Sequence, residues 1–181
     1  MIRVLHSSSA VERLRAAGEF IAGFPAGTEI LLVGAARDAV DDLVREIARS
    51  RGATFGLHRF SLMQLVARLA VPNLAEGRLT PATNLAAEAV AARAAFEAVN
   101  GGRLNYFAPV SGLPGFVRAA VRTLSEIRLA AVSAEQLEAL GASGSDNAEL
   151  LRNYAQQPIE ASLADRAKIF QAATKSVLAG E

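Results

Sequence analysis

The chain lacks several residue types, and each absence excludes a class of chemistry. It contains no cysteine, which rules out disulfides, thiolate metal ligands and thiol nucleophiles. Its two histidines, His6 and His58, are too few for a histidine-rich metal site. No group of carboxylates shows metal-binding spacing or the pairing of a general acid and base. We therefore expect no catalytic residue, no metal and no cofactor in this chain.

Long apolar runs and phosphate-binding motifs are also missing. No apolar run approaches the roughly 20 residues that span a bilayer, and the N-terminus lacks the apolar core of a signal peptide. These absences predict a cytoplasmic protein with no membrane partner. There is no glycine–lysine–serine or glycine–lysine–threonine triplet, which the P-loop of an ATPase requires. The net charge of +1 gives no global attraction to nucleic acid, so such binding would need a local patch.

What is present predicts an α/β fold. Apolar residues make up 51% of the 181 residues and charged residues 20%, enough for a core. Short apolar segments at residues 2–6, 30–33 and 54–57 predict strands, and helical periodicity follows each of them, at residues 10–21, 36–50 and 61–70. Such alternation predicts a small parallel sheet with flanking helices, its three strands side by side, in a domain of residues 1–71.

Residues 72–181 read as an all-helical subdomain. Helices are predicted at residues 81–99, 116–129, 147–156 and 162–178, with a short helix capped by Ser133. The glycine- and serine-rich residues 141–145 are predicted to form a flexible loop.

Three serines, Ser7, Ser8 and Ser9, follow the first predicted strand, where a P-loop would lie. The segment has neither the glycines nor the lysine of that motif, but the free N–H groups at a helix N-terminus can meet an anion. The serines are therefore either residual phosphate ligands or a plain N-cap of the next helix.

Two further strand-to-helix connections carry candidate DNA-binding residues. Gly34 begins a turn of small residues that would let a polymer backbone approach the sheet, where Arg37 either contacts phosphate or lies on the surface. His58, Arg59 and Ser61 can hydrogen-bond phosphates or stack on bases. The alternative is a half-buried His58 and an N-cap at Ser61. Neighbouring acidic residues at positions 41 and 42 diverge on a helix and are interpreted as solvated surface.

These segments resemble a known family. The sequences ILLVGAARDAVDDLVREIA (residues 30–48) and TFGLHRFSLMQLVARLA (residues 54–70) are similar to the second and third strand–helix elements of UvrD-type superfamily 1 helicases. The closer resemblance is to the B subunit of AddAB/RexAB-type helicase–nucleases, through the run of residues 59–62 and the leucines after it. Gly115-Phe116 and the pattern over residues 123–127 resemble the inserted 1B-like helical subdomain of that family.

The resemblance implies a P-loop NTPase-like half domain with a degenerate ATPase core. It implies an N-terminal fragment, truncated before the rest of the helicase and a PD-(D/E)XK nuclease, of a subunit that acts in DNA repair and recombination as an exodeoxyribonuclease. The fragment itself would be an inactive DNA-binding scaffold, with single-stranded or end DNA and a second helicase–nuclease subunit as partners.

Two rival hypotheses remain open at this point. One is a small α/β protein-interaction module with no nucleic-acid role, which an exposed apolar face on the helix at residues 116–129 would favour. The other is an atypical phosphate-handling hydrolase that uses the three serines.

Overall fold

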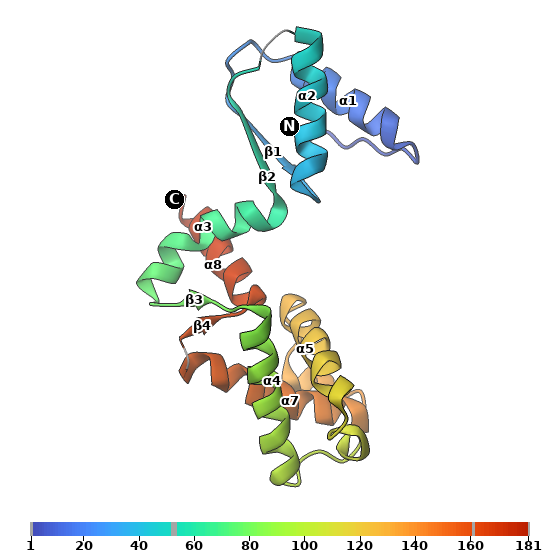
Figure 1. Ribbon diagram of the computed structural model, residues 1–181, viewed down its shortest axis with the longest axis vertical. Helices are drawn as coiled ribbons and strands as arrows, with labels where there is room; N and C mark the ends of the chain where they lie inside the picture. Colours follow the sequence, from blue (N-terminus) through green and yellow to red (C-terminus); the bar gives the residue numbers. More distant parts are fainter. Residues whose placement is uncertain (1, 52–53, 161, 181) are drawn as a thin grey trace. The chain divides into compact units, whose positions relative to one another are not determined.

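The computed structural model describes residues 2–51, 54–160 and 162–180 (Figure 1). The chain divides into two compact units, Met1–Val66 and Ala67–Glu181. The division falls inside one helix, α3 (Leu62–Glu76). Among the described residues, no helix combines the length and the apolar character that crossing a bilayer requires.

The first unit is a small α/β arrangement. It contains α1 (Ala10–Ala22), β1 (Ile30–Gly34), α2 (Arg37–Arg51), β2 (Leu57–Ser61) and the start of α3. The two strands pair in parallel, with Ile30 opposite Leu57 and Gly34 opposite Ser61. The α/β class expected from the alternating pattern is therefore confirmed, with a sheet of two strands within the described residues.

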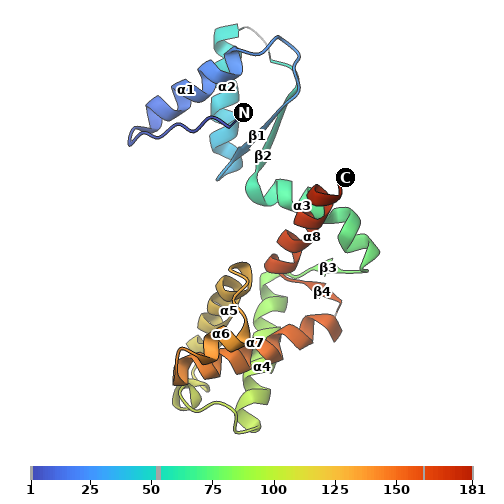
Figure 2. The same cartoon turned by 180° about the vertical axis from the view of Figure 1, so that it is seen from behind.

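Helix α2 covers one face of this sheet. Its buried residues Val40, Val44 and Ile47 recur at helical spacing, so they form one apolar stripe. In both views α2 lies between the sheet and α1 (Figures 1 and 2). The opposite face of β1 is open, because Leu31 is 52% exposed and Val33 is 45% exposed. Parallel sheets are normally buried on both faces, so this face is unusual for its class.

The strand predicted at residues 2–6 is wrong. Among the described residues this segment pairs with no strand, and Ile2 and Val4 are 93% and 85% exposed. An apolar, β-branched run shows only that a segment suits a pleated surface, whereas pairing requires a neighbour from elsewhere in the chain. The three-stranded arrangement expected from the sequence is thus reduced to the β1–β2 pair.

The strand predicted at residues 54–57 lies later in the chain, over Leu57–Ser61. The preceding Gly56 adopts a positive φ of 75°, and its carbonyl accepts a hydrogen bond of 2.8 Å from the Ile30 N–H. A Cβ atom on Gly56 would lie 2.6 Å from the Thr28 carbonyl oxygen. Gly56 therefore ends the connecting loop and sets where pairing begins, so that His58 and Arg59 belong to the strand.

The second unit is mainly helical. After α3 it contains β3 (Thr80–Pro81), α4 (Asn84–Asn100), the 3-10 turn η1 (Ala108–Val110), α5 (Pro114–Leu129), α6 (Ala134–Glu138), α7 (Ala142–Glu160), β4 (Leu163–Ala164) and α8 (Arg166–Ala179). Its core forms where α4, α5 and α7 meet, and includes Ala94, Ala98, Leu124, Leu150 and Tyr154. Alanines on α4 allow the neighbouring helices to approach closely.

The loop predicted at residues 141–145 is also wrong, because α7 begins at Ala142. A Cβ atom on Gly144 would lie 2.0 Å from the Leu137 carbonyl oxygen of α6. The glycine is therefore present to let α6 pass over the first turn of α7. Pro81, predicted to start a helix, instead pairs in the short parallel β3–β4 bridge, and α4 starts after the N-cap Thr83.

Two buried acidic residues fix the loops of the second unit. Asp146 is 2% exposed and accepts hydrogen bonds from the backbone N–H groups of Asn105 (3.0 Å to Oδ1) and Phe107 (2.8 Å to Oδ2). Asp165 accepts a hydrogen bond from the Lys168 N–H at the start of α8, and the Arg128 guanidinium donates to both of its carboxylate oxygens. Satisfied in this way, both carboxylates stabilise the fold.

Candidate nucleic-acid interface

The turn between β1 and α2 is tight, and Gly34 makes it possible. A Cβ atom at this position would lie 2.5 Å from Val40 Cγ2 and 3.1 Å from the Ala36 carbonyl oxygen. The small residue therefore lets the first turn of α2 pack against the end of the strand. The sequence suggested that a polymer backbone would use this space, whereas the structure fills it with the side chain of Val40.

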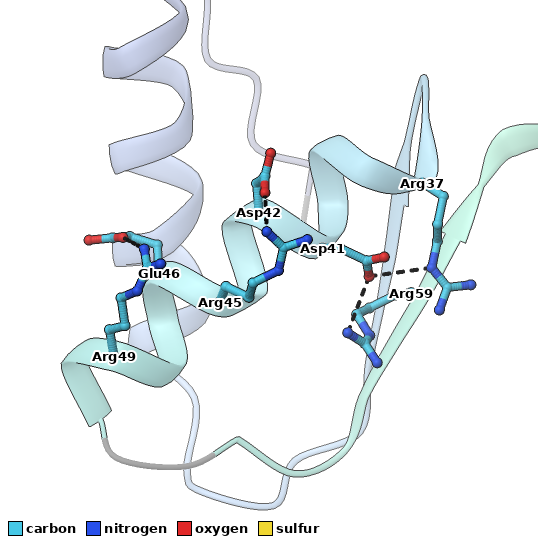
Figure 3. A network of polar contacts seen from close by, with 7 residues as sticks. All are labelled: Arg37, Asp41, Asp42, Arg45, Glu46, Arg49 and Arg59. Atoms are coloured by element: carbon cyan, nitrogen blue, oxygen red, sulfur yellow. Dashed lines mark hydrogen bonds and ion pairs between the residues drawn. The ribbon is translucent and has the colours of Figure 1, made fainter.

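Arg37 and Arg59 converge on one carboxylate just beyond this turn (Figure 3). Arg37 Nε lies 3.3 Å from Asp41 Oδ1, one turn along α2, and Arg59 Nη1 reaches the same oxygen at 3.1 Å from β2. The two arginine side chains are each 40% exposed and the aspartate side chain is 24% exposed. We call these three residues the arginine cluster.

Two ion pairs follow the arginine cluster along α2. Arg45 lies 2.7 Å from Asp42, and Arg49 lies 3.1 Å from Glu46, each one turn away (Figure 3). In the arginine cluster, two guanidinium groups share one carboxylate, which leaves one positive charge in excess. The helix N-terminus adds a partial positive charge nearby, and the exposed Asp38 in the same turn opposes it.

His58 and Ser61, the other two candidates from this region, lie outside the arginine cluster. Side chains alternate along a strand, so His58 faces away from α2, where it is 53% exposed and lies 3.9 Å from Glu29. Ser61 caps α3, since its Oγ accepts from the Gln64 N–H at 3.2 Å and the Gln64 side chain accepts from the Ser61 N–H. The N-cap alternative for Ser61 therefore describes its local contacts.

Two of the three serines before α1 are engaged in starting that helix. Ser9 is the N-cap and accepts from the Glu12 N–H. Ser7 accepts from the Ser9 N–H, donates to the Glu12 carboxylate, and offers its carbonyl to Arg13. With a carboxylate beside them and no strand before them, these serines lack the setting of a phosphate loop.

Asp41 is the functional candidate that the sequence did not reveal. Its spacing of four from Arg37 was a visible signal, because residues at that spacing are neighbours on a helix. The contact with Arg59 joins separate elements and becomes visible only in the fold.

Both units have depressions in their surfaces, apart from the arginine cluster. A groove of about 760 Å³ runs between α1 and α2, with Leu14, Gly18 and Leu43 among its lining residues. An apolar cleft of about 470 Å³ lies between η1, α5 and α7, lined by Phe107, Phe116 and other residues. Neither contains the arginine cluster, and the described part of the chain holds no group of three potential metal ligands.

No protein-family model matches the chain, and a search of curated proteins finds no significant match.

Proposed function

We propose that this chain is a DNA-facing scaffold region, without ATPase activity, of a DNA-end-processing helicase–nuclease subunit. The observation that carries the proposal is the convergence of Arg37 and Arg59 beside the turn that follows β1. Crevices beyond the carboxyl ends of parallel strands are where open α/β sheets bind ligands. Arginine suits phosphate recognition because its fork of N–H donors can contact two oxygens at once.

The proposal draws its biological setting from the resemblance to the B subunit of AddAB/RexAB-type helicase–nucleases. Under it, the first unit is a degenerate P-loop NTPase-like half domain, and the second corresponds to the 1B-like helical subdomain. Ser7 to Ser9 are left out of the proposed site, because Ser7 and Ser9 are engaged at the start of α1. Phosphate contact comes instead from the arginine cluster, and the partner is single-stranded or end DNA.

Binding of labelled oligothymidylate, followed by fluorescence anisotropy against salt, tests this function. The double substitution Arg37→Ala and Arg59→Ala should weaken binding at least about tenfold, since each charge-assisted hydrogen bond contributes roughly 1.5–3 kcal/mol. The control is the double substitution Arg45→Ala and Arg49→Ala, which removes the same charge from neighbouring positions of the first unit. Equal losses in the two double variants would show that the arginine cluster is not a DNA site.

Titration calorimetry with ATP and Mg²⁺ tests the other half of the proposal. No binding heat and no turnover are expected, because the chain has no P-loop lysine, and Ser7 and Ser9 are engaged at the start of α1. Binding that depends on Mg²⁺ would instead favour the phosphate-handling hydrolase.

A protein-interaction module is the second candidate, and the open face of β1 with Leu31 and Val33 favours it. Helix α5, the other candidate for this role, buries Leu124, which is 1% exposed, whereas Leu129 at its end is 39% exposed and Phe116 lines the apolar cleft. An interaction module predicts oligothymidylate binding no stronger than that of the Arg37 and Arg59 double variant.

A further inference from the structure

We propose that Asp41 competes with phosphate for Arg37 and Arg59, so that this carboxylate sets the affinity of the arginine cluster for a single phosphate group. The inference rests on the proposed function, because it assigns a role at the same site. It is carried by the geometry of one carboxylate held by two guanidinium groups from different elements (Figure 3).

Both guanidinium groups contact the same atom. The distances to Asp41 Oδ1 are 3.3 Å from Arg37 Nε and 3.1 Å from Arg59 Nη1. Two donors that meet at one oxygen atom are arranged for one anionic group at that point. A carboxylate and a phosphate offer arginine the same kind of acceptor oxygens. Asp41 therefore occupies the position in which one phosphate oxygen would lie.

The exposure of the three side chains allows exchange. Each arginine is 40% exposed, so solvent-borne phosphate reaches the guanidinium groups. Asp41 is 24% exposed, and the ion pairs at this exposure are individually weak. When a phosphate displaces Asp41, two such ion pairs are broken, and their energy is subtracted from the binding free energy of the phosphate.

The local charge makes this competition matter. With Asp41 in place the cluster carries one excess positive charge, and without the carboxylate it would carry two. Asp42, the next residue, pairs with Arg45 alone at 2.7 Å and belongs to a balanced pair. Substitutions of the two aspartates by asparagine are therefore a matched comparison, because each substitution removes the same charge from adjacent positions of one helix.

The test measures oligothymidylate affinity of the whole chain as a function of salt. Asp41→Asn should tighten binding about fivefold, the equivalent of two exposed ion pairs of roughly 0.5 kcal/mol each. Its plot of log affinity against log salt should keep the wild-type slope, because the number of phosphates contacted on the strand does not change. Asp42→Asn should change affinity less than about twofold. Asp41→Glu should restore near-wild-type affinity, because it returns the competing carboxylate.

Each alternative result identifies a different error. Weaker binding by Asp41→Asn, with circular dichroism unchanged, would overturn the inference, since Asp41 would then position the arginines for DNA. Equal gains in Asp41→Asn and Asp42→Asn would overturn it in favour of a general charge effect. The triple variant that adds Arg37→Ala and Arg59→Ala to Asp41→Asn should lose the gain. If those two substitutions change nothing in either background, the proposed DNA site itself fails.

Discussion

Gly144 lies in the first turn of α7, and replacing it with alanine should destabilise the second unit. The added Cβ atom would lie 2.0 Å from the Leu137 carbonyl oxygen and 2.9 Å from the Leu140 Cβ. The closest atom belongs to the backbone, so no change of rotamer relieves the overlap. Either α6 must move away from α7, or the start of α7 must unwind.

The magnitude follows from two opposing effects. Forcing an extra carbon into a packed interface costs about 1–3 kcal/mol, and a backbone overlap of this size belongs at the upper end. Alanine in place of glycine within a helix returns up to about 1 kcal/mol. We therefore expect Gly144→Ala to lower the free energy of unfolding by about 2 kcal/mol.

Tyrosine fluorescence during urea unfolding provides the assay. The chain has two tyrosines and no tryptophan, and both tyrosines, Tyr106 and Tyr154, lie in the second unit. The signal therefore follows this unit alone. Gly115→Ala in α5 is the control, because a Cβ atom at this position would meet nothing within 4 Å. The free energy of unfolding of this variant should therefore equal or exceed that of the wild type. If Gly144→Ala behaved like this control, α6 would not cross α7 as described.

Further substitutions in the second unit test its polar contacts, by tyrosine fluorescence where both tyrosines are kept and by circular dichroism for the comparison with Tyr154→Phe. Arg128→Ala removes the ion-pair partner of the 10%-exposed Asp165 carboxylate and should lower the free energy of unfolding by about 3 kcal/mol. The control Arg122→Ala breaks an exposed ion pair on the same helix and should lower it by less than about 0.5 kcal/mol. Similar losses in the two variants would contradict a buried role for the Arg128–Asp165 pair. Asp146→Asn exchanges the buried carboxylate that accepts from two loop N–H groups for an amide and should lower the free energy of unfolding by about 2 kcal/mol. An unchanged unfolding midpoint would mean that the loop does not depend on this carboxylate. Burial, reinforced by the nearby Asp165 carboxylate, raises the pKa of Tyr154 in the folded state. The neutral phenol therefore contributes fully to the free energy of unfolding below about pH 10, and this contribution is lost as the pH rises through the raised pKa. Tyr154→Phe should remove that part of the alkaline loss of stability, and an identical pH profile in both proteins would refute it.

The sequence predicts those elements that depend on local pattern. Helices α1, α2 and α5 and strand β1 lie within a few residues of their expected bounds, because apolar spacing and capping residues are visible in a short window. The short helix after Ser133 forms with the predicted cap, since Ser133 and Gln136 make reciprocal hydrogen bonds.

The errors arise where distant contacts decide. Residues 2–6 have strand-like composition but no partner, and strand pairing cannot be seen in one segment. Residues 141–145 look like a loop because they are small, yet Gly144 among them is small because α6 packs against the first turn of α7 at this point. Within the candidate site, Arg37 and Arg59 are predicted from their places in the alternating strand–helix pattern. Their meeting at Asp41 depends on the pairing of β1 with β2, which brings Arg59 beside α2.

The open face of β1 has a practical consequence for handling the protein. Leu31 and Val33 present a bare apolar surface on a strand pair whose outer backbone groups offer a template for further strands. Concentrated samples should self-associate through this face in a salt-tolerant way, unlike contacts made by the arginines. Leu31→Lys would place a charge on that surface and reduce turbidity, while the face that carries Arg59 stays unaltered.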